Sequence, residues 1–370
     1  ANNVSVAVAT DSITLDQTAP TLSVAGLGLA SGAASTNSLS PVFAHSASDA
    51  TSGLAQVCTG DASPPTTCVA YTTSPTVTLT AGDGMKTGFI RVSDGAGNVS
   101  FILSDSITLD QTAPGVSNAS INGGAMFTNS TTVSVTSVAS DAIGVTQMQL
   151  SNSGVGGFGA PVPYLSPVNT PLSAGDGTKT ILVRVLDAAG NTSGVASDTI
   201  TLDTTAPTTT ISINSGARYT QSATVSVAFV PTETGSGVAQ RCLKEVAVGA
   251  PAPATPTAAD VCFVAYTATA MHTLVAQGDR RVHAWLLDNA GNITAAPATY
   301  DIFFDSIVPT TPTSTVATAG HRTLSLSWNN SADASSGVQG YEVGLSLVSG
   351  GPYVYGTLVP HAGGTTNQTL

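Results

Sequence analysis

The sequence predicts an all-β protein made of antiparallel β-sandwiches repeated in tandem and arranged as a rod. Two strings of residues recur at long intervals, apolar residues alternate with a period of two, and turn residues interrupt the alternation frequently. Only 9% of the 370 residues are charged, whereas Gly (37) and Pro (20) are abundant. Helical bundles need Glu, Lys, Leu and Arg, so this composition disfavours them.

The first recurring string marks the domain junctions. DSITLDQTAP occurs at Asp11–Pro20 and unchanged at Asp105–Pro114, and DTITLDTTAP follows at Asp198–Pro207. A second string ending in A-G-N precedes each later copy, as in GDGMKTGFIRVSDGAGN at Gly82–Asn98. Successive aspartates of the first string are 94, 93 and 102 residues apart, and we call them the linker aspartates: Asp16, Asp110, Asp203 and Asp305.

A spacing above 90 residues is too long for a solenoid repeat, so each repeat is predicted to be a whole domain. The predicted organisation is a tail of a preceding repeat at 1–16, three sandwiches at 17–110, 111–203 and 204–305, and a partial domain at 306–370.

The first repeat carries about seven short apolar segments, which is typical of an antiparallel sandwich. No stretch between them has the length of a crossover helix, so a parallel sheet is not expected. The predicted strands begin at Pro20 and continue at Leu39–Ser48, Leu54–Thr59, Cys68–Thr73, Thr76–Ala81, Lys86–Ser93 and Val99–Leu109.

D-x-A-G-N between two late strands, paired with L-D-x-T-A-P at the junction, resembles the bacterial immunoglobulin-like repeats of large surface adhesins. The resemblance covers residues 17–305 as three copies, with 1–16 resembling the tail of a fourth. It implies immunoglobulin-like sandwiches, which mostly serve as spacers.

The last stretch departs from this pattern. Leu324–Val343 resembles two strands of a fibronectin type III domain, with Trp328 as the buried tryptophan and Tyr341 as the tyrosine of the next strand. Only 61 residues follow Pro309, so the domain is expected to be partial, and both ends of the sequence are interpreted as cuts through a longer protein.

Four cysteines occur as one pair in the first repeat and one in the third. The second repeat has Gln149 and Pro161 at the equivalent positions, so both members of a pair are present or both are absent. Four cysteines allow three connectivities, and pairing within a repeat keeps each domain self-contained. We predict the disulfides Cys58–Cys68 and Cys242–Cys262, with small buried thiols as the alternative. Disulfides would imply an extracellular or cell-surface setting.

The acidic residues are 19 Asp and only 3 Glu, and 16 of the Asp recur at fixed positions in the repeats. Besides the linker aspartates, they follow the second predicted strand (the loop acids Asp49, Asp141 and Asp333, with Glu233 in the third repeat) or open the A-G-N turn (the turn aspartates Asp94, Asp187 and Asp288). Others lie five residues before the linker (Asp11, Asp105 and Asp198) or at the opposite pole, where turn capping is expected (the distal aspartates Asp83, Asp176 and Asp279).

Immunoglobulin-like topology brings three of these positions to one pole of each sandwich. The predicted triplets are Asp16, Asp49 and Asp94; Asp110, Asp141 and Asp187; and Asp203, Glu233 and Asp288. Converging carboxylates with loop carbonyls suit Ca²⁺, which takes 6–8 oxygen ligands. The alternative is that each Asp caps its own turn through Asx hydrogen bonds. At the fourth junction Asp305 and Asp333 are present without a turn aspartate, so the weakest site is expected there.

No enzymatic motif stands out, and a non-catalytic protein is predicted. The five histidines lie at non-equivalent positions, and neither a nucleophile elbow nor a phosphate-binding loop is present. A net charge of −12 with 10 basic residues argues against nucleic acid as a partner. No apolar run approaches the 18 residues of a membrane span.

The first functional hypothesis is a structural stalk of an extracellular bacterial adhesin or surface fibre. Its partners would be other domains of the same long chain, with a host, prey or neighbouring-cell ligand bound by regions outside this sequence. The alternatives are accessory modules of a secreted enzyme and a laterally assembling sheath or filament protein. The near-identical linkers favour a long array and therefore the stalk.

Overall fold

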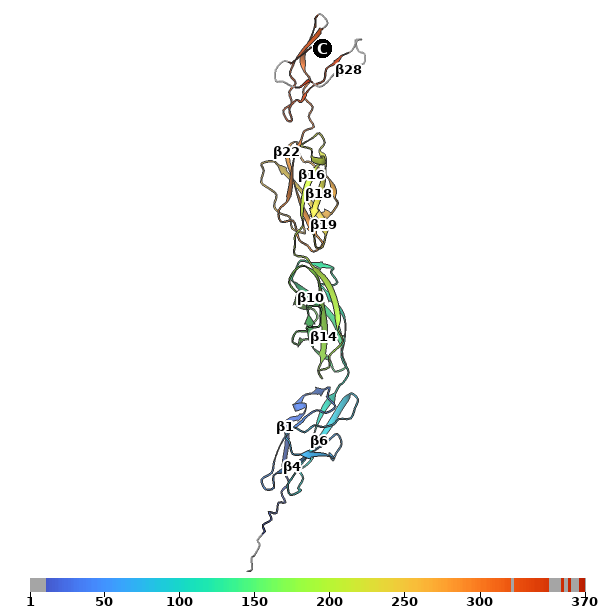
Figure 1. The fold of residues 1–370 in the computed structure, drawn as a ribbon, viewed down its shortest axis with the longest axis vertical. Coiled ribbons are helices and arrows are strands. Elements are labelled where there is room, and N and C mark those ends of the chain that lie inside the picture. Colours follow the sequence, from blue (N-terminus) through green and yellow to red (C-terminus); the bar gives the residue numbers. More distant parts are fainter. Residues whose placement is uncertain (1–10, 321–322, 346–353, 356–358, 361–365, 370) are drawn as a thin grey trace, which may run out of the picture. The chain divides into compact units, whose positions relative to one another are not determined.

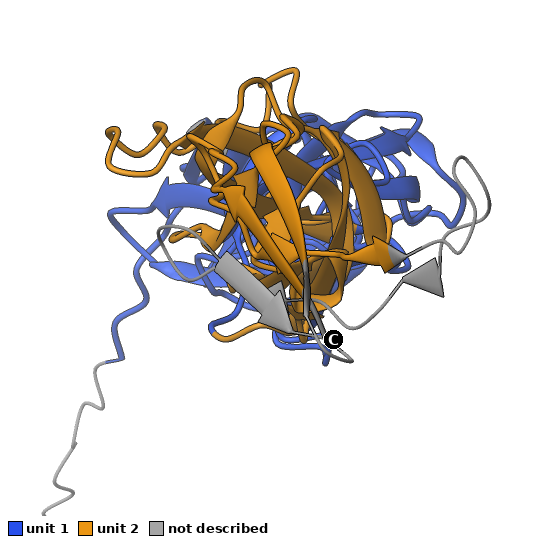
Figure 2. Ribbon diagram, turned by 90° about the horizontal axis from the view of Figure 1, so that it is seen from above, with its two compact units in different colours: residues 1–126, 131–174, 178–200 blue, residues 127–130, 175–177, 201–370 orange. Residues whose placement is uncertain are grey.

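The computed structural model describes residues 11–320, 323–345, 354–355, 359–360 and 366–369 (Figure 1). Most of the predicted tail at 1–16 and much of the predicted last domain lie outside these residues. The chain divides into two compact units, one of residues 1–126, 131–174 and 178–200 and one of residues 127–130, 175–177 and 201–370 (Figure 2). No helix within the described ranges is long and apolar enough to cross a membrane.

The first sandwich pairs a small sheet with a five-stranded one. Strands β1 and β3 form the first sheet, and the second has the order β2-β7-β6-β4-β5. Alternating burial along β6 places Ile90 and Val92 in the core. The strands are β1 (Thr21–Leu29), β2 (Ser35–Thr36), β3 (Phe43–Ser48), β4 (Leu54–Gly60), β5 (Thr67–Ala70), β6 (Gly84–Asp94) and β7 (Leu103–Leu109).

The second sandwich repeats this plan with one more strand. Its sheets have the orders β13-β10-β8 and β12-β11-β14-β15-β9. The strands are β8 (Gly115–Ile121), β9 (Phe127–Thr128), β10 (Thr132–Ser140), β11 (Val145–Ser151), β12 (Val162–Pro163), β13 (Val168–Pro171), β14 (Gly177–Asp187) and β15 (Ala196–Leu202).

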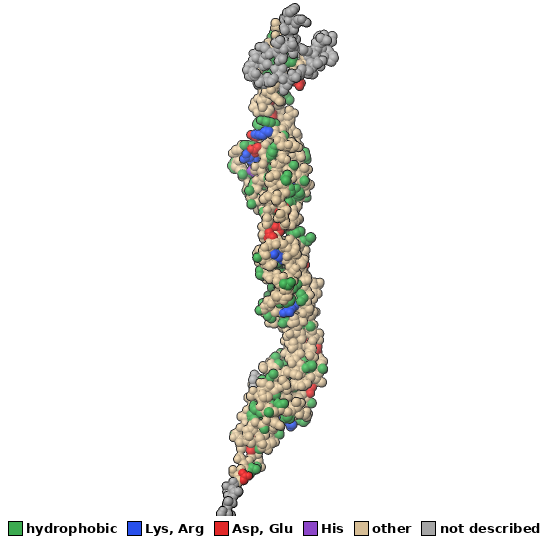
Figure 3. Space-filling model, viewed as in Figure 1, with side chains coloured by type: hydrophobic (Ala, Val, Ile, Leu, Met, Phe, Trp, Pro, Cys, Tyr) green, Lys and Arg blue, Asp and Glu red, His purple; other side chains and the backbone are tan. Residues whose placement is uncertain are grey.

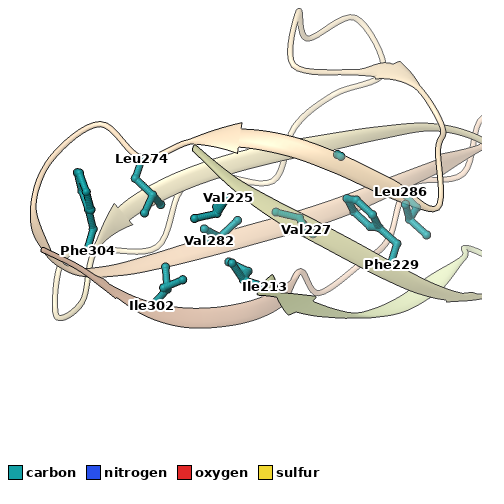
Figure 4. Close-up of a cluster of buried hydrophobic side chains, with 11 residues drawn as sticks. Ile213, Val225, Val227, Phe229, Leu274, Val282, Leu286, Ile302 and Phe304 are labelled. Atoms are coloured by element: carbon teal, nitrogen blue, oxygen red, sulfur yellow. The ribbon is translucent and has the colours of Figure 1, made fainter. Parts of the chain in front are cut away.

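The third sandwich has sheets of order β16-β18-β21 and β17-β23-β22-β19-β20. Figure 4 shows its core, in which side chains of β18, such as Val225 and Val227, lie beside Val282 of β22 and Ile302 of β23. The strands are β16 (Thr208–Ile213), β17 (Tyr219–Thr220), β18 (Thr224–Thr232), β19 (Val238–Ala247), β20 (Val264–Ala265), β21 (Thr269–Thr273), β22 (Gly278–Asp288) and β23 (Ala298–Phe304).

The described part of the last domain contains the aromatic pair predicted from the sequence. Trp328 and Tyr341 are 5% and 8% exposed, and their ring centroids lie 5.2 Å apart. The elements are β24 (Thr313–Gly320), β25 (Thr323–Asn329), β26 (Gly340–Tyr341), β27 (Gly344–Leu345), β28 (Val354–Tyr355), β29 (Val359–Pro360) and β30 (Thr366–Thr369).

The predicted fold class is confirmed as far as it concerns tandem all-β sandwiches, and two details of the strand prediction are wrong. Thr76–Ala81 is not a regular strand, because it is joined to the neighbouring segment by an isolated bridge between Val42 and Thr76 and by single backbone bonds, from Val77 N–H to Pro41 and from Leu79 N–H to Leu39. The last strand of the first sandwich begins at Leu103 and not at Val99, because Val99 forms only an isolated bridge to Ser93 after the turn.

Charged side chains are sparse on the face drawn in Figure 3.

Candidate metal centres at the linkers

Each sandwich brings the three predicted acidic side chains together. In every triplet, one ligand atom per residue lies within 4.8 Å of the others. The linker aspartates are 8%, 3% and 1% exposed and the turn aspartates are similarly buried, whereas the loop acids are partly exposed. The predicted convergence is therefore present in all three repeats. The triplets are Asp16, Asp49 and Asp94; Asp110, Asp141 and Asp187; and Asp203, Glu233 and Asp288.

The backbone N–H of three linker aspartates, Asp110, Asp203 and Asp305, bonds to the sandwich before each of them. The N–H of Asp110 donates to the carbonyl of Thr36 at 2.9 Å, and Asp203 makes the same bond to Thr128. The acceptors lie in the two-residue strands β2 and β9, which pair in parallel with β7 and β15. These short parallel strands were not predicted, because two residues show no periodicity.

The carbonyls of three linker aspartates, Asp16, Asp110 and Asp203, accept a hydrogen bond from the sandwich after each of them. Asn191 donates its Nδ2 to the carbonyl of Asp110 at 2.9 Å, and Asn292 donates to the carbonyl of Asp203 at the same distance. Asn98 donates to the carbonyl of Asp16 at 3.1 Å. The asparagine of the A-G-N turn is therefore a linker-binding residue, which the sequence analysis did not recognise.

The turn aspartates shape the A-G-N turn and orient its asparagine. Oδ1 of Asp187 accepts from the N–H groups of Ala189, Gly190 and Asn191 at 2.7–2.9 Å. Its Oδ2 accepts from Nδ2 of Asn191 at 2.8 Å. Asp94 and Asp288 bind Asn98 and Asn292 in the same way. Turn capping, one of the two predicted roles, is present at these positions.

The carboxylate of the linker aspartate has the same first partner at all four junctions. Its Oδ1 accepts from the N–H two residues ahead, as in Thr112 N–H to Asp110 at 3.0 Å, which is an Asx turn. The other three bonds of this kind join Asp16 to Thr18, Asp203 to Thr205 and Asp305 to Ile307.

The second carboxylate oxygen distinguishes the junctions. Oδ2 of Asp16 accepts from the N–H and the hydroxyl of Ser52, and Oδ2 of Asp203 accepts from the N–H of Ser236 at 2.6 Å. Asp305 accepts from the N–H of Ser336 at 3.1 Å. Oδ2 of Asp110 is buried and has no hydrogen-bond partner among the described residues.

The carboxylates of the loop acids Asp49 and Asp141 also accept hydrogen bonds from backbone N–H groups of their own loops. Oδ1 of Asp49 accepts from the N–H groups of three residues, Thr51, Ser52 and Gly53. Asp141 accepts from only two, Ile143 and Gly144, because its loop is one residue shorter.

The distal aspartates differ from the prediction, because two of them bind the following linker. Asp83 accepts from the N–H of Gln111 at 2.8 Å and from the hydroxyl of Thr112. Asp176 accepts in the same way from Thr204 and Thr205. The third, Asp279, forms an ion pair with Arg218.

Two aspartates, Asp105 and Asp198, lie five residues before the linker aspartate and accept a backbone hydrogen bond from the first strand of their sandwich. Asp105 accepts from the N–H of Leu29 at 2.9 Å, and Asp198 accepts from the N–H of Ile121 at 2.7 Å.

Hydrogen bonding lowers the pKa of several junction carboxyls. The hydroxyl of Ser52 and the N–H of Thr18 hold the pKa of Asp16 below its ordinary value of 3.8. Burial raises the pKa of Asp94, but the hydrogen bonds from Asn98, Gly97 and Ala96 together outweigh this, and the net direction is downward. Asp305 also has a lowered pKa, first because of Ser336.

We therefore expect acid to release the Asp16 linker from its loop. A lowered pKa means that the bonded carboxylate stabilises the docked linker at pH values above 3.8, and that this contribution is lost as the pH falls through the lower, docked value. The amide resonance of Thr18, whose N–H donates to Oδ1 of Asp16, should titrate in this range in NMR spectra. The Asp16→Asn variant is the control and should give a flat profile; titration in both proteins would contradict the assignment.

Both predicted disulfides are present, Cys58–Cys68 and Cys242–Cys262. The former joins directly paired residues of β4 and β5. At the equivalent position of the second sandwich, Gln149 accepts from Nε of Arg184 at 2.8 Å and donates to the carbonyl of Gly159.

No protein-family model matches the chain, and no curated protein matches it. Among solved structures, the chain is similar to a tetra-tandem repeat in the extending region of a large adhesion protein (19% identity, TM-score 0.28, covering 95% of this chain and 90% of that one). It is also similar to fibronectin(III)-like modules of Clostridium thermocellum CbhA (6%, 0.31, 50% and 94%). The D00–D0 domain of Intimin gives 13%, 0.23, 51% and 99%.

Proposed function

We propose that this chain is a non-catalytic stalk or spacer of an extracellular bacterial adhesin or surface fibre. The observation that carries the proposal is that two successive linkers are hydrogen-bonded to both of their neighbouring sandwiches. Each of Asp110 and Asp203 donates its N–H to the sandwich before it and accepts at its carbonyl from the sandwich after it. A linker bonded on both sides transmits orientation from one domain to the next, which a spacer needs and an isolated module does not.

Two further observations support a stalk outside the cell. Proline follows the linker aspartate at Pro20, Pro114 and Pro207, and it restricts both its own φ and the residue before it. The two disulfides suit an oxidising compartment, where they form and persist. A binding tip, for a host, prey or neighbouring-cell surface, would then belong to other regions of the longer protein.

We also propose that Ca²⁺ stiffens the linkers. The triplets provide carboxylate oxygens within 4.8 Å of one another, which is the hard oxygen chemistry that Ca²⁺ prefers. Bound calcium would tie the linker to the loop and to the A-G-N turn of the following sandwich. It would also offset part of the −12 charge that repels along the chain.

Small-angle scattering of the whole chain tests the stalk. Each sandwich should span about 40 Å at roughly 3.3 Å per residue, so four in line give a maximum dimension on the order of 150 Å. A scattering profile of a compact globule would contradict the proposal.

A further inference from the structure

We propose that Ca²⁺ binds at only one of the three linker triplets, that of Asp110, Asp141 and Asp187, and that a serine amide takes the place of the cation at the others. This inference rests on the proposal that the linkers bind Ca²⁺, and it assigns that binding to the junction between the first and second sandwiches.

The Asp110 carboxylate is the starting observation. Asp110 is 3% exposed, its Oδ1 accepts from Thr112, and its Oδ2 has no hydrogen-bond partner. The carboxylates of Asp141 and Asp187 each bring an oxygen within 4.8 Å of it. A buried carboxylate oxygen without a donor and beside two like charges is unfavourable, so this pole lacks a positive group.

The missing donor has a simple origin in the sequence. The closing glycine lies four positions after the loop acid in the first sandwich (Asp49 to Gly53), in the third (Glu233 to Gly237) and in the last domain (Asp333 to Gly337). In each of these loops the residue before the glycine is a serine, and its N–H reaches the linker aspartate. In the second sandwich Gly144 lies only three positions after Asp141.

The shortened loop uses its amides elsewhere. The residue before its glycine is Ile143, and its N–H donates to the loop acid Asp141 at 2.8 Å. No amide of this loop bonds to Asp110 Oδ2. The shorter loop therefore leaves Oδ2 of Asp110 without the serine donor and open to a cation.

The other triplets lack this vacancy on the linker aspartate. Both carboxylate oxygens of Asp16 accept hydrogen bonds, and both of Asp203 do. In the third triplet, Oε2 of Glu233 is also buried and has no hydrogen-bond partner among the described residues, but it belongs to the loop acid and not to the linker aspartate. A cation at the third triplet would compete with the hydrogen bond from the Ser236 N–H, which already satisfies Oδ2 of the buried Asp203.

The donor set favours Ca²⁺ over other cations. The group consists of three carboxylates, without a cysteine or histidine among the described residues of the triplet, which disfavours Zn²⁺. Mg²⁺ demands a nearly ideal octahedron, which flexible loops supply poorly. With one oxygen from each carboxylate, the side chains provide three of the 6–8 ligands that Ca²⁺ takes, so second carboxylate oxygens, water or backbone carbonyls would complete the shell.

Calorimetric titration of the chelator-treated full chain with Ca²⁺ tests the inference. We expect one Ca²⁺ per chain in the wild type. Asp110→Asn should weaken binding at least tenfold, whereas Asp16→Asn and Asp203→Asn, the matched changes at the other linkers, should leave it unchanged. Titration with Mg²⁺ should give much weaker binding.

A loop variant tests the mechanism without removing any carboxylate. Inserting one serine between Ile143 and Gly144 gives the second loop the length of the first and a serine before the glycine. This variant should lose Ca²⁺ binding while its circular dichroism spectrum and melting curve remain those of the wild type. Retained binding would show that the missing amide is not the reason for the site.

The outcomes separate this inference from the broader proposals. More than one bound Ca²⁺, or binding that survives in Asp110→Asn, overturns the single site and leaves calcium-stiffened linkers standing. No binding at millimolar Ca²⁺ overturns both calcium statements, while the stalk itself is still judged by scattering.

Discussion

Reduction of the disulfides is expected to destabilise the first and third sandwiches by about 3 kcal/mol each and to leave the second unchanged. The bridges close loops of 10 and 20 residues, so the chain-entropy model gives the third sandwich the slightly larger loss. The third also has more to lose in packing, because fully buried Cys242 contacts Phe263 and Trp285.

Hydrogen exchange of the full chain, with and without reductant, resolves the sandwiches by their strand amides. The second sandwich is the internal control, because Gln149 and Arg184 hold the equivalent position by hydrogen bonding alone. Cys58→Ser should reproduce the effect in the first sandwich only. Equal loss in all three sandwiches would mean that the reductant acts by another route.

Replacing Trp285 with alanine is expected to destabilise the third sandwich by about 3–5 kcal/mol, the usual cost of truncating a buried large aromatic side chain. The indole is 0% exposed and packs in a second small core with Cys242, Phe263 and Leu287. It also stacks on His283, with ring centroids 5.9 Å apart.

The matched control is Arg184→Ala, at the same strand position in the second sandwich. Arg184 is partly exposed and lies over the ring of Phe158 at 4.1 Å, so its removal should cost only about 1 kcal/mol. Trp285→Phe should recover most of the loss, because the indole nitrogen has no hydrogen-bond partner to forfeit. Exchange of the β22 amides measures the effect of Trp285→Ala, and exchange of the β14 amides measures that of Arg184→Ala. Equal effects of the two changes would contradict the packing argument.

The features that recur with a clear period were predictable from the sequence. Alternation along Gly84–Asp94 predicted a strand with one buried face, and its burial alternates as expected. The fixed positions of Asp110, Asp141 and Asp187 predicted their convergence, because immunoglobulin-like topology places the linker and the two loops at one pole.

The features that depend on single backbone groups were not predictable. The bond from Asn191 to the linker carbonyl follows from the geometry of the A-G-N turn. The unpartnered Oδ2 of Asp110 follows from the loop before Gly144, which is one residue shorter than its counterparts and so does not bring a backbone N–H to this oxygen. Trp285 stands where the second repeat has Arg184, and its burial is seen only in the structure. The loop between β19 and β20 brings Phe263 and Cys262 against it, which no periodicity reveals.

Scattering from the whole chain, compared with the Asn191→Ala, Asn292→Ala double variant, tests the central claim that held linkers make a spacer. The wild type should give a maximum dimension on the order of 150 Å with a narrow distribution. The variant should keep its folded sandwiches but give a broader and shorter distribution, because two linker carbonyls lose their donors. Identical profiles for the two proteins, or a compact wild type, would contradict the account.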